Sequence, residues 1–126
     1  MRIPIALSAA VLFTAWPAAT QQPGPLAQVE RGRWELRGPS GTSVGALCLG
    51  DPILLAQPQN APHPCSSEIL SIVDHVVTVS FVCPGMGRGR SALRIETPRL
   101  VQIDSQGIAN GVPFALRAQA RRTGPC

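Results

Sequence analysis

The chain lacks tyrosine and lysine altogether, and aromatic residues make up only 4% of its 126 residues. Proteins that bind single-stranded nucleic acid stack bases on aromatic side chains and surround phosphates with dense basic patches. All eleven basic residues here are arginine, and they face seven acidic residues, which gives a net charge of +4. Because this excess is mild and few aromatic platforms exist, we expect no nucleic-acid partner.

The chain also lacks an apolar run of about 20 residues, the length that a membrane-spanning helix needs. Its longest nearly apolar stretch, residues 3–16, follows the positive start Met1-Arg2 and precedes small residues at 18–20. This order is typical of a secretory signal peptide. We therefore expect residues 1–20 to be removed on export, with no transmembrane segment left and a periplasmic or secreted location. Loss of Arg2 leaves ten arginines against seven acids, a mature charge of +3.

The sequence has only four cysteines, and all of them follow the predicted signal peptide: Cys48, Cys65, Cys83 and Cys126. Four cysteines in a small exported chain indicate two disulfides. Three pairings are possible. We favour Cys48–Cys65, which closes a local loop, together with Cys83–Cys126, which ties down the last residue.

Period-two alternation of apolar and polar residues predicts about seven short strands. We expect them at 32–38, 44–50, 68–73, 76–83, 90–97, 100–104 and 113–122, the fourth being the most secure because of its β-branched residues. Links this short require antiparallel pairing. The predicted fold class is therefore all-β, a single antiparallel sheet of about seven strands, curled into a partly open barrel or a small sandwich.

The segments between these strands carry helix and turn signals. Asp51-Pro52 predicts one short helix, with Asp51 as its N-cap and the proline in the first turn. Asp74-His75 and Asn110-Gly111 predict tight turns. The polar, proline-rich residues 21–30 predict a flexible lead-in to one disulfide-bonded domain over 31–126.

The stretch CPGMGRGR, residues 83–90, has the alternating glycines of a phosphate-binding loop. Such a loop leads into a helix, whereas this one joins two strands and lacks the lysine of a nucleotide-binding P-loop. We expect Gly85, Gly87 and Gly89 to let the chain reverse. Arginine captures carboxylate or phosphate with two parallel hydrogen bonds, so the candidate binding residues are Arg88, Arg90, Arg94 and Arg99. The alternative is that they are ordinary solvated charges on outward strand positions.

No residue pattern predicts catalysis. Asp74-His75 lies among several serines, but no nucleophile elbow occurs, and the pair is better explained as a turn. The acids are scattered, and an even cysteine count leaves no spare thiol. The spacing of His63 and Cys65 is not that of zinc ligands, and no C-x-x-C occurs. We expect no enzyme activity, no metal and no cofactor.

Several motifs, taken in order, resemble a family of small exported bacterial proteins catalogued as domain of unknown function 3617. They are the opener Gly32-Arg33-Trp34-Glu35, CLGDP at 48–52, CPGMGRGR, ETPRLVQIDSQGI at 96–108 and the final ARRTGPC. The resemblance implies an exported, disulfide-bonded, mainly β domain and brings no established activity. Members often begin PGLWE, and Arg33 departs from that pattern.

Gly32-x-Trp34 on a first strand is also similar to lipocalin-like barrels. There a tryptophan closes the barrel base under an arginine of the last strand, a part that Arg121 or Arg122 would take here. The alternative is that Trp34 is simply the largest core side chain.

These observations together predict a monomeric, non-catalytic exported domain that binds an envelope protein, lipid or glycan. The alternative is a small periplasmic inhibitor that presents the Gly/Arg loop 84–90 to a hydrolase. A pre-organised loop suits that role, because little ordering entropy remains to be lost on binding.

Overall fold

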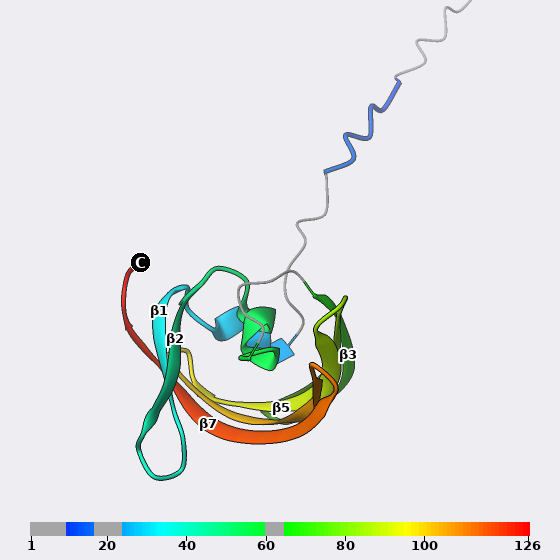
Figure 1. The fold of residues 1–126 in the computed structure, drawn as a ribbon. Helices are drawn as coiled ribbons and strands as arrows, with labels where there is room; N and C mark the ends of the chain where they lie inside the picture. The colour runs from blue at the N-terminus through cyan, green and yellow to red at the C-terminus, as the bar shows by residue number, and fades with distance from the viewer. Residues whose placement is uncertain (1–9, 17–23, 60–64) are drawn as a thin grey trace, which may run out of the picture.

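The computed structural model describes residues 10–16, 24–59 and 65–126, and its ordered elements form one antiparallel sheet with two short 3-10 helices (Figure 1). The strand order is β2-β1-β7-β6-β5-β4-β3, and every neighbouring pair is antiparallel. The predicted all-β class, with one sheet of seven strands, is confirmed. The strands are β1 (Gly32–Arg37), β2 (Ser43–Leu49), β3 (Ser66–Val73), β4 (Val76–Cys83), β5 (Gly87–Thr97), β6 (Leu100–Ala109) and β7 (Val112–Gly124).

The sheet curls around the two helices without closing into a barrel (Figure 1). The first strand pairs with the last, which leaves β2 and β3 as the two edges. η1 (Gly24–Gln28) and η2 (Pro52–Ala56) fill the concave side, where Leu26 and Leu55 are fully buried. The chain therefore forms the open version of the predicted barrel and not a closed, lipocalin-like one.

In β1, β4 and β7 the alternation of apolar and polar residues in the sequence matches the alternation of buried and exposed residues in the structure. In β4 the residues at 77, 79, 81 and 83 are buried, while those between them are partly or fully exposed. The same holds for Trp34 and Leu36 in β1, and for Ala118 and Ala120 in β7. One face of these strands thus joins the core, whereas β3 has no fully buried residue. The largest fully buried apolar side chains are Trp34, Leu26, Leu49, Leu55, Leu93, Val77, Val79 and Val101.

The predicted helix and turns are present. The side chain of Asp51 accepts a hydrogen bond of 3.1 Å from the backbone N–H of Ile53, as an N-cap does. Asp74 (φ 53°) and Asn110 (φ 51°) have the left-handed backbone that tight turns require. Buried Ser91 fastens η2 to the sheet, because its Oγ lies 2.5 Å from the carbonyl oxygen of Ala56 and 2.7 Å from Oγ of Ser105.

The expected lead-in is part of the domain over its described residues. η1 occupies residues 24–28 of the predicted 21–30 segment, and Leu26 and Val29 belong to the core. Because residues 21–30 are polar and proline-rich, their sequence did not indicate that Leu26 and Val29 pack into the core. Residues 21–23, and positions 1–9 and 17–20 of the predicted signal peptide, lie outside the described residues.

The disulfide pairing favoured from the sequence is wrong. The bonds are Cys48–Cys126 and Cys65–Cys83, with Cα atoms 5.7 and 4.4 Å apart. Cys65 lies just before β3 and Cys83 ends β4, so the β3–β4 hairpin brings them together. Cys48 reaches the C-terminus because β1 pairs with both β2 and β7, placing Arg33 between Cys48 and Gly124. Two disulfides are typical of an oxidising, extracytoplasmic environment.

Candidate functional site

The stretch CPGMGRGR is mostly strand. Only Pro84–Met86 form a turn, closed by a 2.9 Å hydrogen bond from the backbone N–H of Met86 to the carbonyl of Cys83. β5 begins at Gly87, so Arg88 and Arg90 lie on a paired strand and not on a loop. The expectation of a Gly/Arg loop over 84–90 is therefore wrong for residues 87–90.

Gly85, Gly87 and Gly89 are not required for the same structural reason. Gly85 sits in the turn with φ 74°, which is the reversal expected for all three. Gly87 (φ 146°) packs so close to β6 that a Cβ would collide with the carbonyl oxygen of Ile108. At Gly89 a Cβ would lie 2.7 Å from the ring of Phe81. The last two glycines thus permit close packing of the sheet, because no side chain fits there.

Arg88 and Arg90 are exposed and point to the outer face of the sheet, since the intervening positions of β5 belong to the inner face. Arg88 stands between Val82 and Ile108 in the sheet register, and Arg90 stands between Ser80 and Gln106. None of these direct cross-strand neighbours is acidic. Within the described part of the chain neither arginine forms an ion pair.

Two open hollows adjoin these arginines. One, of about 560 Å³, is lined by residues of β4 to β7 that include Arg88, Arg90 and Gln106. The other, of about 530 Å³, lies against the turn at Pro84–Met86. Both are lined by Val82, Arg88 and Ile108, so they are adjacent. We call this surface the open end of the sheet, defined by Arg88 and Arg90, the two turns at 84–86 and 110–111, and the exposed Val82 and Ile108.

The other two candidate arginines are engaged within the protein. Arg94 lies on the same outer face but pairs with Glu96 at 3.3 Å. Elsewhere on that face Arg117 lies 3.6 Å from Asp104, and Arg37 lies 3.8 Å from Glu35. The structure therefore separates the four arginines that the sequence places close together, and only Arg88 and Arg90 remain without a carboxylate.

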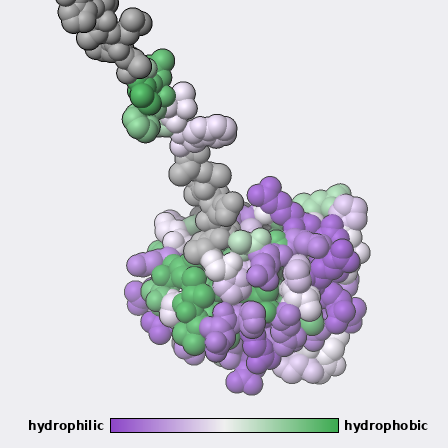
Figure 2. All heavy atoms as spheres, turned by 180° about the vertical axis from the view of Figure 1, so that it is seen from behind, coloured by the Kyte–Doolittle hydropathy of each residue, from purple (hydrophilic) through white to green (hydrophobic). Residues whose placement is uncertain are grey.

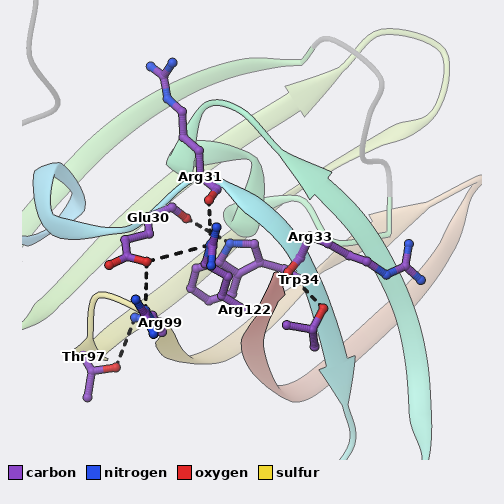
Figure 3. A network of polar contacts seen from close by, with 8 residues as sticks. Glu30, Arg31, Arg33, Trp34, Thr97, Arg99 and Arg122 are labelled. Carbon is purple, nitrogen blue, oxygen red and sulfur yellow. Dashed lines mark hydrogen bonds and ion pairs between the residues drawn. The ribbon is translucent and has the colours of Figure 1, made fainter. Parts of the chain in front are cut away.

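Arg99 belongs to a network at the opposite end of the strands, which we call the braced end (Figure 3). Its Nε lies 2.9 Å from a carboxylate oxygen of Glu30, and Nε of Arg122 lies 3.8 Å from the same oxygen. The backbone of Glu30 donates to the carbonyl of Pro98 and accepts from the indole N–H of Trp34 at 3.0 Å. Glu30 thus joins the segment before β1 to the β5–β6 turn and to β7.

Trp34 and Arg122 are cross-strand partners in this network. Arg122 Nε donates to the carbonyl of Arg31 at 2.7 Å, and a Cβ on Gly32 would lie 2.6 Å from that same Nε. The Gly32-x-Trp34 motif of the first strand therefore lies opposite an arginine of the last strand, Arg122, although the sheet does not close into a barrel. Trp34 is fully buried, so it is also the largest core side chain.

The polar residues considered for catalysis are dispersed. Asp74 and His75 are exposed in the β3–β4 turn, where the carbonyl of His75 accepts from the backbone N–H of Ile95. His63 lies outside the described residues. In residues 10–16, 24–59 and 65–126 no three His, Cys, Asp or Glu side chains gather as metal ligands would.

Comparison with known proteins adds no assignment. No family model, no curated protein and no solved structure matches the chain. The resemblance to domain of unknown function 3617 therefore stays a prediction. Over the described ranges, no helix is long and apolar enough to cross a membrane.

Sequence reasoning missed Glu30 as the centre of the braced end, because it stands in a segment expected to be a lead-in. It also missed the partners of the open end, Ser80 and Gln106, since these depend on the register of three strands. One signal was available: counting from the turn at 84–86 aligns β5 with β4 without a bulge and places Arg90 opposite Ser80.

Proposed function

We propose that the protein is an exported, non-catalytic binding domain of the cell envelope, and that its outer sheet face at the open end holds an anionic ligand. The observation that carries this proposal is the pair Arg88 and Arg90. They lie about 7 Å apart on one strand face, border an open hollow, and have no acidic cross-strand neighbour. A phosphate or carboxylate is the partner that such guanidinium groups bind best.

Export is supported by two features. The apolar residues of 10–16 pack against nothing, since Leu12 is 89% and Phe13 93% exposed. Their removal with a signal peptide would cost the domain no core contacts. Both disulfides also fit an oxidising compartment outside the cytoplasm.

A binding role without catalysis is supported by how the buried polar groups are used. Ser91 and Ser105 are the buried hydroxyls of the described chain, and they hold η2 against the sheet. The hollows at the open end lie on the surface, and the concave interior is filled by η1, η2 and Trp34. Such a surface suits recognition of a large or surface-bound partner.

The inhibitor alternative has less support, because it needs a projecting Gly/Arg loop. The turn spans only Pro84–Met86, and the two arginines belong to the paired strand β5. A sheet face presents a broad contact surface and no single segment for insertion into a cleft.

The test is affinity capture from envelope extracts with two charge-matched variants as bait. R88A/R90A removes the unpaired arginines, and R94A/R117A removes two ion-paired arginines from the same face. We expect R88A/R90A to lose at least tenfold of the captured anionic component, and R94A/R117A to lose less than twofold. Equal losses in both variants would show that general charge, and not this site, holds the ligand.

A further inference from the structure

The open end combines cationic and aliphatic groups on one surface. Val82 and Ile108 flank Arg88 directly across the sheet, and they are 53% and 39% exposed. Val112, at the start of β7, is also exposed, but it pairs with Ala109 and therefore shares the inner-face parity of the buried Ala118 and Ala120. The Cβ atoms of residues directly opposite in a sheet lie about 5 Å apart, so the side chain of Arg88 stands between two apolar neighbours.

The turns at Pro84–Met86 and Asn110–Gly111 lie at the same end of the strands. The backbone N–H of Asn110 donates to the carbonyl of Met86 at 2.8 Å, which holds the two turns together. Gly87 and Ala109 continue the same pairing into the sheet. Arg88, Val82 and Ile108 are therefore neighbours on the outer face of three paired strands whose turns are hydrogen-bonded to each other.

The large exposed side chains of this surface are aliphatic and cationic. Protein interfaces are enriched in tyrosine, tryptophan, phenylalanine, methionine and arginine. Around the open end Phe81 is buried and Phe114, which lines the hollow, is partly buried, while valine, isoleucine and arginine are the large exposed side chains of the described surface there. Aliphatic side chains next to arginine match the interface of a bilayer, where phosphates lie just above glycerol and acyl carbons.

The distribution of polarity over the rest of the molecule is different. Seen from behind, most of the surface is polar, and apolar side chains gather on the side where β3 forms the edge (Figure 2). Leu70, Ile72 and Val73 are exposed there, but the only charged residue of β3 is Glu68. That edge therefore offers apolar surface without the cations that the open end has.

We propose that the open end docks on a bilayer surface that contains anionic phospholipid. Arg88 and Arg90 contact the lipid phosphates, while Val82 and Ile108 rest against the glycerol and upper acyl region. This inference rests on the proposed function, because it names the ligand class of the same surface. Attachment is reversible: two arginines and a few aliphatic side chains provide far less than a membrane-spanning helix.

The test is co-sedimentation of the exported, disulfide-bonded chain with vesicles of equal phosphatidylglycerol and phosphatidylcholine. Each arginine near an anionic surface contributes about 1 kcal/mol, so R88A/R90A should lower the partition coefficient about 30-fold. R94A/R117A carries the same net charge and should lower it less than threefold. V82S/I108S, which keeps both arginines, should lower it by roughly tenfold.

Two further arms separate the bilayer from other sources of phosphate. Vesicles of phosphatidylcholine alone should not sediment the protein. Inorganic phosphate, at the same phosphate concentration as the vesicles, should displace less than half of the bound protein. Displacement of all the protein by inorganic phosphate would assign the arginines to a free anion and overturn the bilayer proposal.

Failure of the two proposals gives different results. If wild type does not sediment with the anionic vesicles, or R94A/R117A loses as much as R88A/R90A, the bilayer proposal is overturned. The proposed function still stands in that case if capture from envelope extracts depends on Arg88 and Arg90. If neither assay depends on these two arginines, both proposals fail. Circular dichroism and a thiol assay confirm that each variant keeps its fold and both disulfides.

Discussion

Two arginines at one end of the sheet and two at the other have opposite surroundings, although Arg31 and Arg33 near the braced end are exposed and form no ion pair with the described residues either. At the braced end Arg99 and Arg122 share the carboxylate of Glu30, and Arg122 also bonds the backbone of Arg31 (Figure 3). At the open end Arg88 and Arg90 face solvent between uncharged neighbours. The same residue type therefore maintains the fold where an acid lies beside it, and is available for a ligand where none does.

Each end also has its own disulfide, and removing them should give the largest difference in stability. Cys48–Cys126 at the braced end spans 78 residues, and Cys65–Cys83 at the open end spans 18. In the chain-entropy model these separations correspond to about 4.5 and about 3.2 kcal/mol. We expect C48A/C126A to lower the free energy of unfolding more than C65A/C83A does, in urea denaturation. A larger loss of stability in C65A/C83A would contradict the proposed difference between the braced end and the open end.

Replacing Trp34 by alanine should cost about 3–5 kcal/mol, because it removes a fully buried side chain and leaves a cavity. It also removes the indole N–H bond to the carbonyl of Glu30. Chemical denaturation monitored by far-UV circular dichroism measures the loss. A loss below 1 kcal/mol would mean that the braced end does not depend on its tryptophan.

Replacing Glu30 by glutamine should cost about 1 kcal/mol. Its carboxylate is 40% exposed and pairs with two arginines, and exposed pairs contribute about 0.2–1 kcal/mol each. The measurement is a double-mutant cycle of E30Q with R99A. A coupling energy between Glu30 and Arg99 that falls as the salt concentration is raised agrees with an ion pair. Zero coupling at low salt would show that Arg99, like Arg88, has no ion-pair partner.

R88A/R90A should change the free energy of unfolding by less than about 0.5 kcal/mol, because both side chains are exposed and unpaired. R94A/R117A, which breaks two exposed ion pairs, should cost somewhat more. Thermal unfolding of both variants in one buffer provides the comparison. If R88A/R90A proves the more destabilised, the open-end arginines stabilise the fold and the contrast between the ends is lost.

The strands were predictable because their signal is local. Alternation along β4 and β7 is set by which face of the strand meets the core, and this requires no knowledge of the partner strand. The N-cap at Asp51 and the turns at Asp74 and Asn110 are likewise properties of short segments. Local chemistry therefore identified the elements and the class of the fold.

The disulfides show where local reasoning stops. Val73 pairs with Val76 and Ser66 with Val82, so counting back from the Asp74-His75 turn brings Cys65 opposite Cys83 only if one residue bulges near Leu70. Cys48–Cys126 depends on the pairing of the first and last strands, which no local pattern encodes. The partner of Arg99 is likewise not encoded locally, since Arg99 meets Glu30 across 69 residues.

The central claim is that Arg88 and Arg90, alone among the candidate arginines, are available to a ligand. The most direct test is the binding of R88A/R90A and R94A/R117A to vesicles and to envelope extracts under identical conditions. The account predicts that R88A/R90A loses most of its binding in both and that R94A/R117A stays close to wild type. Equal binding by the two variants in both assays would contradict it.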